Sequence, residues 1–358
     1  MSPVKLAYVL PLGRCPDPPE QQLERFPHNQ RLLCTLAERH GIDAHALWES
    51  ATTATVVRDH VVHHFTPHLV RTVARLRPDV VHVNGLVFPR LTLGLRLALG
   101  RRGRLVVQHH GEGPGQWRSL QAQRVARRAV DCYLFCGLPG QAEPWRRARV
   151  LAASTPVAEV LEASSDLVPG SGGPVDPAGP SGPAPSGGPN VIWVGRLVPG
   201  KDPLTALDAF ERFAVEHPLA RLWMVGSGSG PLRGTVQAAL GGRAVLIGPR
   251  PQRELAGWFA RADVVLSTSW HEGSGYAVIE AIGCGCVPAL SDLPSHRAIA
   301  GPGAAYFPPG DAAAAAGALA QAAARAAQPA ARNTQRRYFE THLSWERVSD
   351  QLAAAYER

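Results

Sequence analysis

The sequence predicts an α/β protein built from two doubly wound domains. Short apolar runs rich in β-branched residues alternate with helical patterns, first between about residues 4 and 136 and again from residue 190. Alternation of this kind is typical of βαβ units and parallel sheets. Residues 164–189 separate the two series and consist almost wholly of Ser, Gly, Pro, Ala and Asp, so they cannot bury a core. A length of 358 residues agrees with two domains.

The first series predicts a domain that covers residues 1–163. Its short apolar runs are typical of strands, and the amphipathic stretches between them are typical of helices. We expect strands at 4–10, 79–83, 104–108 and 131–136, and helices at 20–40, 64–77, 89–100 and 117–130. Residues 164–189 are interpreted as a flexible linker or exposed loop.

The second series predicts a domain that covers residues 190–340. We expect, in chain order, a strand at 190–195, a helix at 202–216, a strand at 221–225, a helix at 231–240, a strand at 244–247, a helix at 251–261, a strand at 263–267, a helix at 276–283 and a strand at 286–290. A last amphipathic helix within 341–358 is expected to cross back to the first domain. Ligands are expected in the cleft that the two domains face, at the carboxyl ends of the strands.

The composition excludes several classes of protein. The chain is 45% hydrophobic and 18% charged, and no apolar run approaches the roughly 20 residues that span a bilayer. The first residues lack the charged start and cleavage site of a secretory signal. The six cysteines show no C-x-x-C spacing, so we interpret them as reduced thiols. We therefore expect a cytoplasmic protein rather than a secreted, membrane-spanning or disulfide-framed one.

The excess of positive over negative charge lies wholly in residues 1–163. Residues 1–163 hold 21 Lys and Arg against 13 Asp and Glu, whereas residues 164–358 hold 16 of each. The alternatives are a solvated arginine-rich face, peripheral contact with the anionic inner face of a membrane, or an acidic acceptor. Nucleic acid is not expected as a partner, because no helix-turn-helix, zinc or RNA-reading pattern accompanies the charge.

A basic loop follows the first strand of the second domain and reads GRLVPGKDP over residues 195–203. Glycines let the backbone turn tightly there, and Arg196 and Lys201 project from the cleft-facing end, where two cations suit a diphosphate. Lys201 is one of two lysines beside 35 arginines, which favours a site that uses a compact ammonium group. One Gly and one Arg after a strand are also common in α/β proteins without such a role.

Two acidic residues mark a second loop, HEGSGYAVIE, over residues 271–280. Glu272 lies in the turn after the strand at 263–267, and Glu280 lies about a turn and a half inside the helix that begins near Tyr276. The N–H groups and the positive dipole end of that helix form an anion site. The acids are thus spaced along the cleft wall rather than paired on one helix face.

These two loops, with MVGSGSGPLRG and AIGCGCVPALSDLPSHRAIAG, resemble the C-terminal domain of family 4 glycosyltransferases of the GT-B fold. The likeness is dense from about 190 to 310, and DVVHVNGL and VVQHHGEGP resemble the family's N-terminal domain. The resemblance implies a retaining, metal-independent transfer of a hexose from a nucleoside diphosphate sugar of UDP or GDP type to an acceptor hydroxyl. It implies no cofactor besides this co-substrate, and the acceptor stays open between a lipid, a saccharide and a small natural product.

The resemblance also implies roles for particular residues. Arg196 and Lys201 hold the diphosphate and stabilise the leaving group, Glu272 binds hydroxyls of the transferred sugar, and Glu280 binds those of the ribose. His110, in QHHG, matches the family's active-site histidine near that sugar. Backbone N–H groups that face sugar and phosphate are expected from Gly273, Ser274, Gly275 and Tyr276, and from Gly13, which stands in LPLGR where the family has a double glycine.

Two functions of other classes remain as alternatives: a GT-B nucleotide-sugar epimerase or hydrolase, and a non-catalytic sugar-nucleotide-binding module. An NAD(P) enzyme is disfavoured, because GSGSG at 226–230 lacks the fingerprint spacing. No Asp-x-Asp occurs, which disfavours a glycosyltransferase that holds its diphosphate through a metal. Cys284 and Cys286 are interpreted as small packing residues. An exposed surface helix, rather than a zinc site, is expected for His60, His63, His64 and His68.

Overall fold

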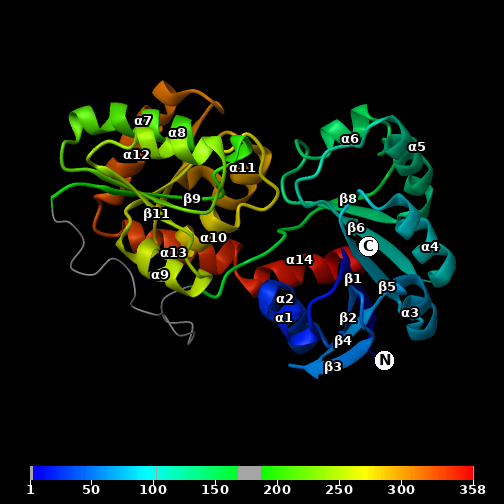
Figure 1. The fold of residues 1–358 in the computed structure, drawn as a ribbon. Coiled ribbons are helices and arrows are strands. Elements are labelled where there is room, and N and C mark those ends of the chain that lie inside the picture. The colour runs from blue at the N-terminus through cyan, green and yellow to red at the C-terminus, as the bar shows by residue number, and fades with distance from the viewer. Residues whose placement is uncertain (1–2, 102, 168–186, 358) are drawn as a thin grey trace. The chain divides into compact units, whose positions relative to one another are not determined.

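The computed structural model describes residues 3–101, 103–167 and 187–357. The chain divides into two compact units, one formed by Met1–Ala163 with Trp345–Arg358 and the other by Ser164–Ser344. Of the predicted linker at 164–189, residues 168–186 lie outside the described residues. Each unit is described by itself below (Figure 1).

The first unit contains an eight-stranded sheet covered by helices. Its strands are β1 (Lys5–Cys15), β2 (Asp43–Ser50), β3 (Ala54–Arg58), β4 (Val61–Thr66), β5 (Val80–Asn84), β6 (Arg104–Gln108), β7 (Cys132–Phe135) and β8 (Val157–Glu159). Its helices are α1 (Pro19–Arg25), α2 (Pro27–His40), α3 (Leu69–Leu76), α4 (Pro89–Leu99), α5 (Trp117–Ala126), the 3₁₀ turn η1 (Arg127–Ala129), α6 (Glu143–Arg147) and α14 (Trp345–Glu357).

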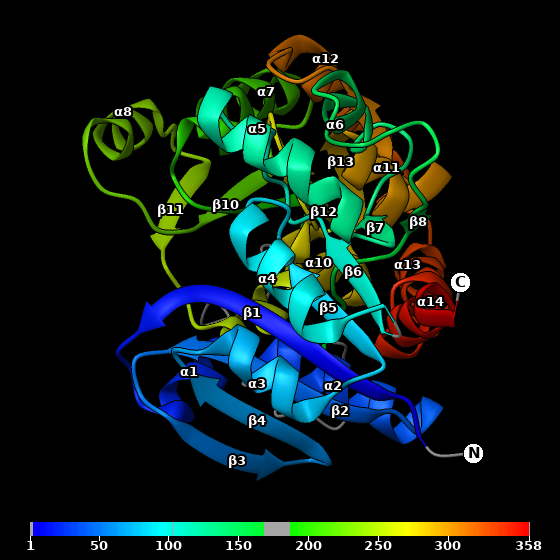
Figure 2. The ribbon, with the colours of Figure 1, turned by 90° about the vertical axis from the view of Figure 1, so that its right-hand side faces the viewer.

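The strand order in this sheet is β3-β4-β2-β1-β5-β6-β7-β8, and every described pair except β3 with β4 is parallel. Alternate residues of each strand point to opposite faces. On one face Val81 and Val83 of β5 join a core that also includes Val73 of α3 and Leu95 of α4. Figure 2 shows α3 and α4 in front of this sheet. The chain changes its direction of winding between β1 and β5, which creates a switch point there.

The C-terminal helix α14 packs against α2 within the first unit, as Figure 1 shows in red and blue. The Tyr356 hydroxyl and His82 Nδ1 share a buried hydrogen bond of 2.7 Å, and Gln351 Oε1 accepts a bond from Leu161 N. Burial lowers the pKa of His82 to about 3, so the ring is neutral. The helix predicted within 341–358 begins at Trp345.

Two sequence-based expectations for helices of the first unit are wrong. The helix expected at 20–40 is two helices, because Pro27 disfavours a helical backbone at Phe26. The helix expected from residue 64 is preceded by the strand β4, so the histidines of this segment do not line a surface helix. His63 is fully buried, Trp48 Nε1 donates to its Nδ1 over 3.0 Å, and burial lowers the pKa of His63 to about 4.

The second unit contains a six-stranded sheet. Its strands are β9 (Asn190–Val194), β10 (Arg221–Val225), β11 (Ala244–Gly248), β12 (Val264–Ser267), β13 (Val287–Ser291) and β14 (Ala305–Phe307). Its helices are the 3₁₀ turn η2 (Pro199–Lys201), α7 (Pro203–Glu216), α8 (Pro231–Ala239), α9 (Gln252–Arg261), α10 (Tyr276–Gly283), α11 (Pro294–Ala300), the 3₁₀ turn η3 (Gly301–Gly303), α12 (Ala312–Ala326) and α13 (Ala331–His342).

This sheet is wholly parallel in its described pairs and has the order β11-β10-β9-β12-β13-β14. Val191 and Trp193 of β9 face a core shared with Phe210 of α7, whereas Ile192 faces a second core with Phe259 of α9. Both faces are thus buried, which explains why these strands are continuous apolar runs. The chain switches from one half of the sheet to the other between β9 and β12.

Close approach of other groups explains Gly226 and Gly228 in the glycine-rich stretch at 226–230. A Cβ on Gly226 would lie 1.7 Å from the carbonyl oxygen of Gly195, because the ends of β9 and β10 meet there. A Cβ on Gly228 would lie 2.5 Å from Leu197 Cβ, so these two glycines serve packing at the strand ends. Cys284 and Cys286 are fully buried in the core beside α9, as expected of packing residues, and all six cysteines are free thiols.

Candidate active site

The loops after β9 and β12 leave the carboxyl ends of neighbouring strands. In a doubly wound sheet, ligands bind where the winding changes direction, outside these ends. Gly195–Lys201 and Thr268–Gly275 therefore flank the switch point of the second unit. The structure thus brings together the two segments that carry the predicted donor-side residues.

Hydrogen bonds hold the first of these loops in place. The Thr268 hydroxyl donates to the carbonyl oxygens of Lys201 and Asp202, over 3.0 and 2.8 Å. Asp202 has a φ of 47° and caps α7 by accepting from Thr205 N, while Trp270 Nε1 donates to the same carboxylate over 2.9 Å. Lys201 is consequently presented from a backbone that both loops stabilise.

Lys201 and Glu272 form an ion pair between the two loops. Their side chains are 24% and 15% exposed, so the pair is largely shielded from water. The Ser269 hydroxyl also contacts Glu272 Oε2, and Ser295 Oγ donates to the Glu272 carbonyl oxygen over 2.8 Å. The predicted cation and the predicted first acid are therefore direct neighbours, although 71 residues separate them in the chain.

Arg196 and the N-terminus of α10 complete this edge of the sheet. Arg196 is exposed, and among the described residues its guanidinium forms no hydrogen bond or ion pair. Gly275 caps α10 with a φ of 68°, and a Cβ there would lie 2.5 Å from Ile299 Cδ1. The turn thus requires glycine. Gly273, Ser274 and Tyr276 flank it, with Ser274 buried.

Glu280 lies in the second turn of α10 and is 5% exposed. Burial raises the pKa of Glu280 to about 7, and the hydrogen bond that Gln252 Nε2 donates over 2.5 Å offsets only part of this rise. Near neutral pH the side chain is therefore divided between its acid and its carboxylate. A ligand hydroxyl that donates to it would favour the carboxylate.

His296 lies close to the Lys201–Glu272 pair. Its ring is fully buried, with Nδ1 2.7 Å from the Ser291 carbonyl oxygen and Nε2 3.4 Å from Ser267 Oγ. Burial lowers the pKa of His296, so the neutral ring adds no cation to this site. The site's positive charge therefore comes from Lys201 and Arg196.

In the first unit, His110 follows β6 at the carboxyl edge of the sheet. Its Nδ1 contacts Glu162 Oε1, and its backbone N–H donates to Glu112 Oε2 over 2.6 Å. Burial would lower the pKa of His110, but the charge of Glu162, its hydrogen bond and the charge of Glu112 raise it above 6.5. The predicted histidine is thus held by two carboxylates of its own unit.

Gly13 lies within β1 rather than in a loop after it. The strand expected at 4–10 continues to Cys15, and its register to β2 shifts between Leu10 and Cys15. Gly13 has a φ of 77°, and its N–H donates to Glu49 Oε2 over 3.1 Å. This backbone donor is therefore already engaged, unlike a donor in an open glycine loop.

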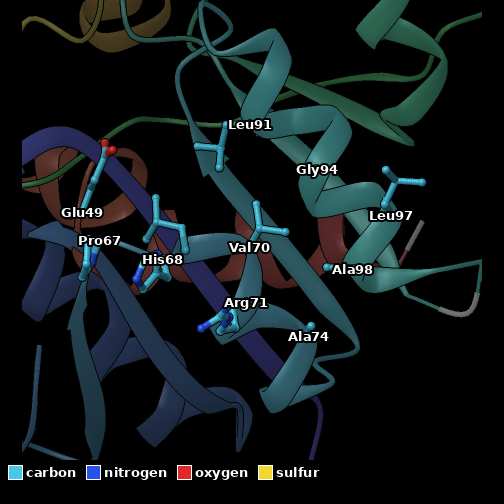
Figure 3. A pocket seen from close by; sticks show the side chains of 11 residues that line it. Glu49, Pro67, His68, Val70, Arg71, Ala74, Leu91, Gly94, Leu97 and Ala98 are labelled. Carbon is cyan, nitrogen blue, oxygen red and sulfur yellow. The ribbon is translucent and has the colours of Figure 1, made fainter.

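A pocket of about 590 Å³ lies beside Glu49 in the first unit. Figure 3 shows Glu49 and His68 on one side of it and Leu91 and Leu97 of α4 on the other. None of the predicted site residues lines it, but Gly13 is linked to its wall through Glu49. Elsewhere, the part of the chain that is described holds no group of three His, Cys, Asp or Glu side chains suited to a metal ion.

Comparison with known proteins relates the second unit to one family. Residues 188–325 match the sequence model of a family described as Glycosyl transferases group 1. A D-inositol 3-phosphate glycosyltransferase of Streptosporangium roseum is 33% identical over 119 residues, which are 30% of this chain and 27% of that protein. The chain thus matches about a quarter of the length of this relative. All predicted donor-side residues from Arg196 to Glu280 lie inside the family match.

Solved structures resemble both units. Sucrose-phosphate synthase of Thermosynechococcus elongatus matches with a TM-score of 0.69 at 19% identity, over 99% of this chain and 98% of that one. A UDP-forming trehalose-phosphate synthase of Burkholderia vietnamiensis matches with 0.69 at 16%, over 100% and 99%. The Anabaena protein HepE, solved with UDP and glucose, matches with 0.65 at 16%, over 99% of each chain. The fold is the GT-B glycosyltransferase fold. The predicted fold class is therefore confirmed.

In this GT-B protein, sequence reasoning misses two neighbours of the site residues. Glu162, which pairs with His110, stands in the plain sequence VLEAS, and Gln252, which donates to Glu280, follows PRP at the start of α9. The one usable signal for Gln252 is its position at the first turn of a helix after a strand end. For Glu162 we find no such signal.

The helices in the described ranges include none both long and apolar enough to cross a bilayer.

Proposed function

We propose that this protein transfers a hexose from a nucleoside diphosphate sugar to an acceptor hydroxyl, with retention of anomeric configuration. The observation that carries the proposal is the Lys201–Glu272 pair at the switch point of a unit whose sequence matches group 1 glycosyltransferases. It joins a phosphate-binding cation to a sugar-binding carboxylate at the edge where α/β sheets bind ligands.

Donor binding replaces the Lys201–Glu272 ion pair with contacts from each side chain to the donor. Without donor, the charge of Lys201 is balanced by Glu272. When a diphosphate arrives, Lys201 and Arg196 bind its oxygens, and Glu272 is released to accept hydrogen bonds from hydroxyls of the sugar. The N-terminus of α10 adds backbone donors to the same anion. Glu280, one and a half turns further on, accepts from the ribose hydroxyls.

Transfer follows from stabilising charge where it develops. The bond between the sugar C1 and the diphosphate oxygen breaks, and its electron pair leaves with the diphosphate, which Lys201 and Arg196 stabilise. The acceptor oxygen bonds to C1 on the same face, and its proton passes to the departing phosphate oxygen. His110 binds the sugar as positive charge grows at C1. No step requires a metal ion or another cofactor, so we expect activity to persist with EDTA.

The donor and acceptor classes are part of the proposal. The fold shared with UDP-forming synthases and with HepE, solved with UDP and glucose, supports a UDP-sugar as the first candidate. A GDP-sugar is the second candidate, from the likeness of the two loops to family 4 glycosyltransferases. Saccharide acceptors rank first, because the fold neighbours act on or are solved with sugars and sugar phosphates by name. The pocket beside Glu49 offers room for an apolar part of a lipid or natural-product acceptor. Peripheral contact of the basic first half with anionic membranes is testable by vesicle sedimentation.

A turnover assay tests this function. The protein is incubated with UDP-glucose, UDP-N-acetylglucosamine, GDP-mannose or other donors, with and without a panel of sugar, sugar-phosphate and inositol phosphate acceptors. We expect nucleoside diphosphate release that depends on acceptor, and a product whose NMR coupling constant shows the anomeric configuration of the donor. Release without acceptor would indicate a hydrolase, a changed donor sugar an epimerase, and binding without turnover a non-catalytic module.

A further inference from the structure

The two ring nitrogens of His110 have different surroundings. Nδ1 contacts Glu162 Oε1, whereas Nε2 is buried and has no hydrogen-bond partner among the residues described. The Glu162 side chain is itself only 7% exposed. A carboxylate accepts hydrogen bonds and cannot donate them, so the ring proton shared by this pair sits on Nδ1. The tautomer of a histidine is set by the hydrogen bond that one nitrogen makes.

We infer that Glu162 is a positioning residue for His110: it holds a proton on Nδ1 and leaves Nε2 as the nitrogen that meets the substrate. The inference rests on the proposed function, which places His110 beside the transferred sugar. In the neutral ring Nε2 then accepts a hydrogen bond, and in the charged ring it donates one. Protonation of His110 therefore changes the hydrogen-bonding role of Nε2, which faces the sugar. The proton on Nδ1, which faces Glu162, stays in place.

Glu112 fixes the backbone of the same histidine but not its ring. Its carboxylate accepts from His110 N over 2.6 Å through Oε2, and from Leu86 N through Oε1. It thereby ties the loop after β6 to the loop after β5. The two carboxylates act at different points: Glu112 places the loop through backbone hydrogen bonds, and Glu162 contacts the ring and sets its tautomer. The charge of Glu112 also raises the pKa of His110, but less than that of Glu162 does.

The charged groups around His110 and Glu162 determine whether the pKa of His110 is raised or lowered. Burial lowers the pKa of His110, and the carboxylates of Glu162 and Glu112 more than offset this effect. Within the described residues, His28 of α2, His82 of β5 and Tyr8 of β1 also interact electrostatically with the pair, and burial favours the neutral form of each. Because they add no fixed charge near neutral pH, removal of the Glu162 charge must lower the pKa of His110.

Nitrogen NMR of the full chain, labelled with ¹⁵N at histidine, tests the inference directly. His110→Asn assigns the His110 signals by their loss. We expect neutral His110 as the Nδ1–H tautomer in the unaltered protein, and a shift toward the Nε2–H tautomer with a lower pKa in Glu162→Gln. Glu162→Asp keeps the charge and should restore most of the pKa. Glu143→Gln, which removes a surface carboxylate paired with Arg147, should change neither.

Kinetics provide the second measurement. Losing a charge-assisted hydrogen bond should lower kcat of Glu162→Gln about 10- to 100-fold, with a smaller change in donor KM. The limb of the kcat–pH profile that belongs to His110 should move to lower pH. Glu112→Gln should lower kcat without changing the tautomer, because its contact is to the backbone.

Two results would overturn the inference: His110 in the Nε2–H tautomer in the unaltered protein, or a tautomer and pKa that Glu162→Gln leaves unchanged. The first measurement needs no variant at position 162, so a folding defect in Glu162→Gln does not prevent the decision. Failure of the proposed function would look different. The NMR result would stand, and no donor would turn over.

Discussion

The two units present their candidate residues in different ways. In the second unit, Lys201 and Glu272 lie in loops after adjacent strands, and each stands in a stretch that resembles a known family. In the first unit, His110 meets a carboxylate 52 residues away that stands in no recognisable pattern. In the proposed function the second unit binds groups common to all nucleotide sugars, so its residue types are expected to recur. The residues for the shared chemistry can therefore be predicted from the sequence, whereas the environment of His110 can be predicted only once the fold is known.

Replacing Lys201 should have the largest effect. If Lys201 binds the leaving diphosphate as proposed, Lys201→Ala removes a stabilising cation, and we expect kcat/KM to fall on the order of 10²–10³-fold. Lys5→Ala is the matched control, because Lys5 is the other lysine and pairs loosely with Asp43 on the surface of the first unit. Steady-state kinetics of both variants decide the matter. A Lys201→Ala enzyme within a factor of three of the unaltered one would remove Lys201 from the site.

Glu272→Gln should lower kcat about 10- to 100-fold while changing donor KM less. In the proposed reaction Glu272 contacts the sugar whose charge changes, so its bonds strengthen on the way to the transition state. The experiment is kinetics with a saturating acceptor, at matched melting temperature. If kcat falls and donor KM rises by the same factor, Glu272 does not act on the sugar. Its role would then be limited to its ion pair with Lys201, the cation proposed to bind the diphosphate.

Glu280→Gln should weaken donor binding and yet stabilise the protein above neutral pH. The pKa of Glu280 is raised from 4.5 to about 7, so the folded state binds this proton more tightly than the unfolded state. The resulting stability is complete below pH 4.5 and is lost as pH rises through 7, a difference of about 3 kcal/mol at most.

Calorimetric melting at pH 8 and at pH 4.5 measures this effect. We expect Glu280→Gln to melt a few degrees higher than the unaltered protein at pH 8 and at the same temperature at pH 4.5, with a raised donor KM. A lower melting temperature at both values would mean that the carboxylate supports α10 and does not serve a ligand.

The smallest effect is expected in the first unit, away from the site. Tyr356→Phe leaves His82 Nδ1 buried without its partner, which should cost about 1–3 kcal/mol of unfolding free energy. Tyr306→Phe in the second unit is the control, because Tyr306 is only half-buried where it donates to Gly301 O. Chemical unfolding compares the two. Equal losses of unfolding free energy in the two variants would mean that the Tyr356–His82 hydrogen bond contributes no more to stability than the half-buried bond of Tyr306.

The strands and helices between 190 and 290 lie within one or two residues of their predicted bounds. These strands are buried on both faces and end near Gly, Pro or Ser, so their pattern is unambiguous. In the first unit, the sequence pattern does not reveal β2 and β4, because histidines such as His63 occupy core positions that are usually apolar. It does not reveal β3 either, because no residue of that strand is buried. The prediction of Lys201 and Glu272 as partners in one site comes from family likeness, and their contact agrees with it.

Local sequence carries no information on contacts that depend on tertiary packing. The extension of β1 to Cys15 depends on pairing with β2, and the pKa of Glu280 depends on burial by α9 and α10. The Glu162–His110 pair joins the segment after β8 to the loop after β6. Such pairs become visible only when the register of the whole sheet is known.

Binding of nucleoside diphosphates is the decisive test of the role proposed for Lys201, because every candidate donor shares this group. Isothermal titration of UDP, GDP, ADP, CDP and dTDP should show at least one that binds one equivalent of protein, in the presence of EDTA. Lys201→Ala should weaken that binding about 10- to 100-fold, as expected for the loss of a charge-assisted contact, while Lys5→Ala should not change it. Absence of binding for all five, or equal affinity in Lys201→Ala, would contradict the account.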